Sequence, residues 1–140
     1  TSVYYVSISG FDTHASQNTF HGRLLTQVND AVLAFVNDMV EAKLFNDTLL
    51  MMFSEFGRRV KQNGSRGTDH GAANQVMLVS GALKKQGFYN DGPDLKNLDE
   101  NGDLRYTVDF REVYATLVDK WLDSDSTKIL QKPFASMQFI

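Results

Sequence analysis

The chain has 140 residues, which is the size of one domain, with 42% hydrophobic and 22% charged residues, as in ordinary globular proteins. Its net charge of −3 and the lack of a basic stripe argue against a nucleic-acid-binding surface, and the absence of cysteine excludes disulfides and thiolate metal sites. No apolar run approaches the roughly 20 residues that a membrane helix requires, so we expect no membrane span.

The first third of the chain predicts a strand, a helix and a second strand. Residues 3–9 are rich in β-branched and aromatic side chains and end at Gly10, as a strand followed by a turn does. Apolar residues recur at three- and four-residue spacing over residues 20–44, which predicts an amphipathic helix. The apolar run at 48–53 predicts the next strand, and such a βαβ unit has parallel strands.

The remaining elements complete an α/β pattern. Residues 75–81 predict a third strand, and Asn101-Gly102 predicts the turn of a β-hairpin. Asp109 is a plausible N-cap for a helix over 110–122, and a short helix is expected over 126–131. We therefore expect residues 1–140 to form a single α/β domain, with a largely parallel sheet, helices on both faces and an added β-hairpin.

Acidic and histidine side chains follow the predicted strands. Asp12 and His14 come just after the first strand, Glu55 follows the second, and Asp69 and His70 lie between glycines in the loop after it. Because ligands bind at the carboxyl ends of parallel strands, these residues are expected to share one sheet edge. Carboxylate oxygens and imidazole nitrogens suit a divalent metal ion, with zinc as first choice and manganese, iron or calcium as the others.

Each of these clusters also has an ordinary structural interpretation. Asp12 and Asp69 are residues that commonly cap their own turns, and a histidine beside them can be a plain surface residue. Arg58 and Arg59 either clamp a phosphate, sulfate or carboxylate group or are simply solvated. The residues alone leave these alternatives open, and they identify no catalytic nucleophile.

Several motifs in order resemble one protein family. G-F-D-T-H-x-x-Q, F-S-E-F-G-R-R, G-T-D-H-G and D-F-R-x-V-Y-A-T-L together resemble the bacterial domain-of-unknown-function 1501 family over essentially the whole chain. That family is in turn similar to the alkaline phosphatase and sulfatase superfamily. The resemblance implies that the chain is the C-terminal part of a longer alkaline-phosphatase-like domain. It also implies a periplasmic or exported location.

The resemblance implies a metal-dependent hydrolase of phosphate or sulfate esters. Its substrate would be a small molecule or a polysaccharide ester, and its nucleophile would come from the N-terminal half of the same protein. Asp12 and His14 would bind one metal ion, Glu55 would replace an aspartate ligand of a second, and His70 would match a late histidine ligand. In a second registration, Asp69 and His70 are themselves the superfamily's Asp-His pair.

One departure from the superfamily pattern supports an alternative function. The residue after Glu55 is Phe56, where the superfamily carries a metal-binding histidine, and phenylalanine cannot be a ligand. The alternative is a non-catalytic exported protein that keeps the fold and binds an anionic ligand.

Overall fold

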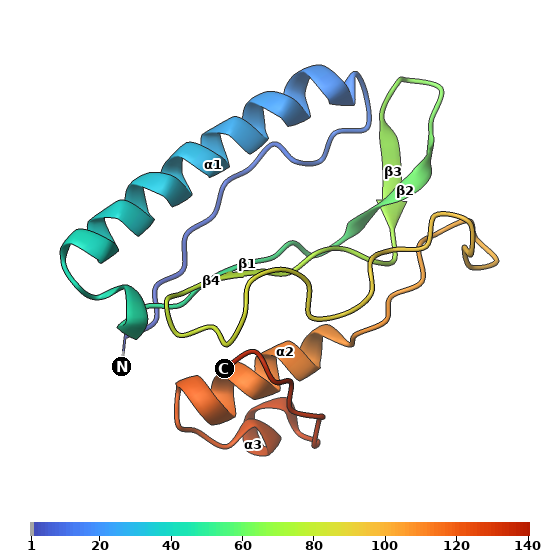
Figure 1. Ribbon diagram of the computed structural model, residues 1–140. Coiled ribbons are helices and arrows are strands. Elements are labelled where there is room, and N and C mark those ends of the chain that lie inside the picture. Colours follow the sequence, from blue (N-terminus) through green and yellow to red (C-terminus); the bar gives the residue numbers. More distant parts are fainter. Residues whose placement is uncertain (1) are drawn as a thin grey trace.

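One of the two small antiparallel sheets lies between a long N-terminal helix and a C-terminal helical layer, and the other projects near the start of the long helix (Figure 1). The structure is a computed structural model and describes residues 2–140. The helices are α1 (Gln17–Glu41), the 3₁₀ turn η1 (Phe45–Asp47), α2 (Phe110–Thr116), its π-helical continuation η2 (Leu117–Trp121) and α3 (Ser126–Leu130). The strands are β1 (Leu50–Met52), β2 (Gly57–Gln62), β3 (Thr68–Gly71) and β4 (Met77–Val79).

Each sheet consists of one antiparallel pair of strands. β1 pairs with β4, so that Leu50 lies opposite Val79. β2 and β3 form a hairpin in which Arg58 lies opposite His70, with an irregular register between Arg58 and Gln62. This hairpin carries Arg58, Asp69 and His70, which take part in the site described below.

The predicted largely parallel sheet with helices on both faces is wrong. The described residues contain only the two antiparallel pairs, and residues 3–9 run as an unpaired, exposed segment in which Val6 is 90% accessible. Apolar β-branched residues favour an extended backbone, but a strand also needs a neighbour to satisfy its N–H and C=O groups. The sequence pattern indicates an extended backbone, but it does not indicate whether a neighbouring strand is present.

Two further differences concern hairpins. The loop expected over 55–71 is largely the β2–β3 hairpin, whose polar first strand lacks the apolar alternation that marks a half-buried strand. The hairpin expected around Asn101 is reduced to a single bridge between Leu98 and Leu104. The helices expected over 20–44, 110–122 and 126–131 are present with shifted ends.

The hydrophobic core joins α2 and η2 to the β1–β4 sheet and to the C-terminal segment. Its buried members are Val113, Leu117 and Phe139, and partly buried side chains from both strands, including Met51 and Leu78, pack against them. By contrast, α1 contributes only Leu24 to the buried residues and exposes large apolar side chains along its length. None of the helices described here combines the length and apolarity needed to cross a membrane.

A charged cap fixes the start of α2. The Asp109 carboxylate accepts a hydrogen bond from the backbone N–H of Arg111 at 2.9 Å and from its Nε at 2.8 Å. The side-chain hydrogen bond from Arg111, followed by the backbone one, lowers the pKa of Asp109 to about 2. Because the folded state depresses this pKa, the stabilisation is present above about pH 4 and is lost as the pH falls toward 2.

We predict that Asp109→Ala lowers the free energy of unfolding by about 1 kcal/mol at neutral pH, since the helix loses its N-cap. Urea denaturation followed by circular dichroism measures this difference. Asp109→Asn is the matched control, because asparagine retains the cap but not the charge. The difference in the free energy of unfolding between wild type and Asp109→Asn should narrow as the pH falls from about 4 to about 2. A difference that does not change over this range would contradict the stabilisation of α2 by the charged Asp109 side chain.

Candidate metal centre

The loop before α1 docks along the tip of the β2–β3 hairpin. The backbone N–H groups of Ser16 and Gln17 donate to the carbonyl oxygens of Ser65 and Arg66, each at 3.0 Å. An isolated antiparallel bridge joins Ala15 to Arg66. These backbone contacts bring two segments about fifty residues apart in sequence into register.

Gly67 makes this docking possible. A Cβ atom at this position would lie 2.2 Å from the carbonyl carbon of His14 and 2.3 Å from its oxygen, far inside van der Waals contact. Asn63 strengthens the contact by donating from Nδ2 to the carbonyl oxygen of His14 at 3.0 Å. The hairpin therefore approaches the loop more closely than any side chain at position 67 would allow.

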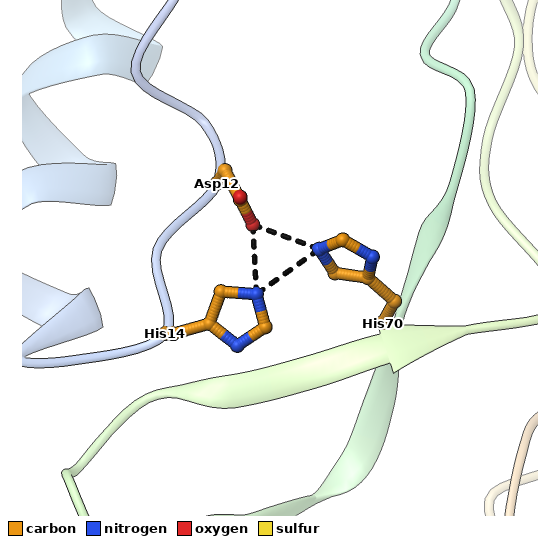
Figure 2. A group of neighbouring side chains, drawn as sticks. All are labelled: Asp12, His14 and His70. Carbon is orange, nitrogen blue, oxygen red and sulfur yellow. Dashed lines mark hydrogen bonds and ion pairs between the residues drawn. The ribbon is translucent and has the colours of Figure 1, made fainter.

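Three ligand-type atoms converge where the loop meets the hairpin (Figure 2). Asp12 Oδ1 lies 2.9 Å from His14 Nε2 and 2.8 Å from His70 Nε2, and the two Nε2 atoms are 3.1 Å apart. Ligands bound to one zinc ion at their usual distances are themselves about 3 Å apart. All three side chains are exposed, so that a ligand can reach them from solvent.

Arg58 holds the Asp12 segment against β3. Its guanidinium donates to the carbonyl oxygens of Phe11 at 2.6 Å and Thr68 at 2.7 Å, and to Asp12 Oδ1 at 3.2 Å. The pKa of Asp12 lies below its usual value, mainly because of the hydrogen bond from His70, with help from His14 and Arg58. Asp12 is therefore an ionised carboxylate at neutral pH.

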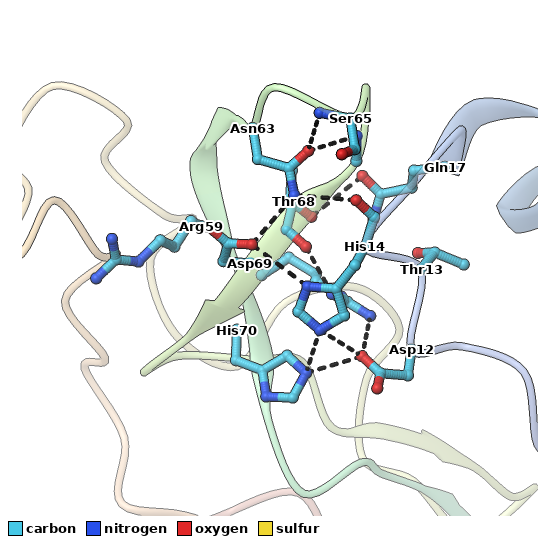
Figure 3. Close-up of polar contacts among 12 residues, drawn as sticks. Asp12, Thr13, His14, Gln17, Arg59, Asn63, Ser65, Thr68, Asp69 and His70 are labelled. Atoms are coloured by element: carbon cyan, nitrogen blue, oxygen red, sulfur yellow. Dashed lines mark hydrogen bonds and ion pairs between the residues drawn. The ribbon is translucent and has the colours of Figure 1, made fainter.

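Phe56 and Asp69 support the two histidines. The ring of Phe56 stacks on that of His70, with centroids 3.7 Å apart and planes within 12° of parallel. Asp69 Oδ1 lies 3.3 Å from His14 Nδ1 and accepts a hydrogen bond from Asn63 Nδ2 at 3.1 Å (Figure 3). Asp69 therefore contacts the side of the His14 ring that faces away from Asp12.

The structure brings some of the predicted site residues together and leaves others apart. Asp12, His14 and His70 converge, whereas Glu55 is exposed and lies outside this group. Arg59 points to the Asp99–Asp103 turn and pairs with Asp103, with Nε 3.2 Å from Oδ1. Asn63 and Gly67 are contributors that the sequence analysis missed, although Asn63-Gly64 is a recognised hairpin-turn dipeptide.

We predict that Gly67→Ala separates the loop from the hairpin, because the new methyl group would overlap the His14 backbone. The amide protons of Ser16 and Gln17 should then exchange faster with solvent, as measured by hydrogen–deuterium exchange. Gly64→Ala is the matched control, since a Cβ there meets nothing within 4 Å. Unchanged protection in Gly67→Ala would show that the docking does not depend on this glycine.

Comparison with known proteins identifies a family for the chain. Residues 2–134 match the family described as "Protein of unknown function (DUF1501)". No curated protein and no solved structure matches the chain. Because the match covers nearly all of the 140 residues, the family resemblance of the ordered motifs is confirmed. The chain belongs to the DUF1501 family of proteins of unknown function.

Proposed function

We propose that Asp12, His14 and His70 hold a divalent metal ion, and that the protein is a metal-dependent hydrolase of phosphate or sulfate esters. The observation that carries the proposal is the convergence of one carboxylate oxygen and two imidazole nitrogens within 3.1 Å of one another. This donor set fits zinc, manganese or iron, with zinc as first choice. Three protein ligands also leave a coordination position for substrate, as catalytic zinc sites do.

Each residue at such a site has a separate role. Asp12, His14 and His70 bind the ion, Arg58 holds the Asp12 segment in place, and Phe56 fixes the plane of the His70 ring. When bound, the ion supplies Lewis-acid polarisation of a phosphoryl or sulfuryl oxygen. By the superfamily resemblance, the nucleophile would come from the N-terminal half of the same protein.

The two arginines differ in their availability to an anionic substrate. The Arg58 side chain is 17% exposed and its guanidinium already has three protein acceptors. The Arg59 side chain is 40% exposed and, within residues 2–140, forms one ion pair, with Asp103. Arg59 is thus the more exposed of the two predicted anion clamps, but its side chain points to the Asp99–Asp103 turn and away from the converging group (Figure 3).

A second candidate function has one observation in its favour. By the resemblance to the alkaline phosphatase superfamily, Phe56 takes the place of a metal-binding histidine, and its ring stacks on His70 instead of adding a ligand. A site with one ligand fewer suits a protein that binds an anionic group at a metal ion without hydrolysing it. In this candidate the same three residues hold the ion.

We predict that the protein binds zinc in a 1:1 ratio, as measured by isothermal titration calorimetry. Asp12→Asn, His14→Ala and His70→Ala should each weaken binding by at least about a hundredfold, since even residues behind the ligands contribute 10- to 100-fold. His21→Ala is the matched control: His21 is the third histidine, and its Nδ1 lies 3.4 Å from Thr13 Oγ1, outside the converging group. Failure of the wild type to bind zinc, manganese or iron would overturn the metal site and both candidate functions.

The hydrolase proposal is tested with p-nitrophenyl phosphate and p-nitrophenyl sulfate. We expect release of p-nitrophenol from one of them only when the divalent metal is present, with loss of activity in the chelated protein and recovery on adding the metal back. His70→Ala should show the same loss without chelator. Tight metal binding with no turnover of either ester would favour the non-catalytic candidate.

A further inference from the structure

We infer that Asp69 is a positioning residue: it keeps His14 in the tautomer that carries its proton on Nδ1, so that the lone pair of Nε2 points toward Asp12 and His70. The sequence predicted Asp69 as a metal ligand. Its contacts in the structure instead indicate that it positions His14. The effect on metal binding rests on the proposed function, whereas the tautomer itself is a property of the protein without metal.

The contact between Asp69 and His14 requires a proton on the ring nitrogen. Asp69 Oδ1 lies 3.3 Å from His14 Nδ1, and an ionised carboxylate can only accept hydrogen bonds. Asp69 Oδ1 also accepts a hydrogen bond from Asn63 Nδ2 at 3.1 Å, and an aspartate carboxylate is ionised at neutral pH. A proton between these two atoms therefore belongs to Nδ1.

The position of Asp69 does not depend on His14, because the hairpin turn holds it. Asn63 Oδ1 accepts hydrogen bonds from the backbone N–H groups of Ser65 and Gly67, each at 3.0 Å. These two bonds fix which end of the Asn63 amide is oxygen, and they direct its Nδ2 to Asp69 at 3.1 Å (Figure 3). The carboxylate is thus set in place before the His14 ring meets it.

The contacts on the other side of the ring favour the same tautomer. The shortest contact in the cluster, at 2.8 Å, joins His70 Nε2 to Asp12 Oδ1. In the protein without metal this contact requires the proton of His70 on Nε2, since the carboxylate only accepts. His14 Nε2 also lies 2.9 Å from Asp12 Oδ1, so Asp12 and Asp69 compete for the one proton of a neutral His14 ring. Asp12 Oδ1 already accepts from His70 and Arg58, whereas among the described residues Asp69 Oδ1 accepts from Asn63 and the His14 ring. The less occupied acceptor, Asp69, is the better partner for this proton, which places it on Nδ1.

This tautomer leaves the Nε2 lone pair of His14 free to bind a cation. A neutral imidazole with its proton on Nδ1 presents a lone pair at Nε2, and this lone pair faces the Asp12 carboxylate at 2.9 Å. Two acceptors this close are stabilised by a positive charge between them. Carboxylates that bind the far nitrogen of a metal-binding histidine act in this way in many metal sites, where they fix the tautomer and the ring orientation.

The test measures the tautomer directly in the metal-free protein by ¹⁵N–¹H correlation spectroscopy of the imidazole rings at about pH 9, where histidines are neutral. We expect His14 to carry its proton on Nδ1. Asp69→Ala should shift it toward the Nε2–H form that free imidazole side chains prefer, and Asp69→Asn should retain the wild-type tautomer, since its amide oxygen can still accept from Nδ1. His14→Gln assigns the signals by removing them, and the unchanged signals of His21, which lies outside the converging group, serve as an internal control.

The second readout is zinc affinity. Asp69→Ala should weaken zinc binding by about 10- to 100-fold, and Asp69→Asn by less. An Nε2–H tautomer of His14 in the wild type, or the same tautomer in wild type and Asp69→Ala, would overturn the inference even if zinc binds. An Nδ1–H tautomer that depends on Asp69 in a protein that binds no zinc would support the inference while the metal proposal fails.

Discussion

The site depends on the docking of the loop before α1 onto the β2–β3 hairpin. Asp12 and His70 are 58 residues apart, and no shared strand or helix joins them. The backbone contacts beside Gly67, the side chain of Asn63 and the Arg58 guanidinium hold the two segments together. The entropic cost of closing such a loop grows slowly with its length, so a few well-placed hydrogen bonds can offset it. The same docking fixes the start of α1, which adds only Leu24 to the buried residues.

Each of the three converging side chains has its own support, and every support comes from the hairpin region. Arg58 contacts Asp12, Asp69 contacts His14, and Phe56 stacks on His70. Two of the three converging residues, however, belong to the other segment. The hairpin therefore orients side chains that it does not itself carry, which explains why its strands are polar and why they pack little apolar surface.

The sequence predicted local features better than long-range ones. The three helices follow from periodicity and from capping residues such as Asp109, because these signals act within a few residues. The prediction of a parallel sheet was wrong because strand pairing depends on partner strands that the residue pattern does not identify. Residue types and glycine-flanked positions were enough to select Asp12, His14 and His70 as candidates. They did not separate these from Glu55, nor assign Asp69 to the far side of the His14 ring, because both distinctions depend on side-chain direction across the docked segments.

Under the proposed function, the charges around His14 also imply an order in which the two ligands bind. The immediate contacts contain two carboxylates, Asp12 and Asp69, and one guanidinium, Arg58. With both imidazoles neutral, one negative charge remains, and the local potential attracts cations and repels ester anions. In the proposed function a divalent ion would reverse the sign of that potential, so that the anionic ligand would be drawn in only after the cation. The same arrangement would then act as an electrostatic gate for the second ligand.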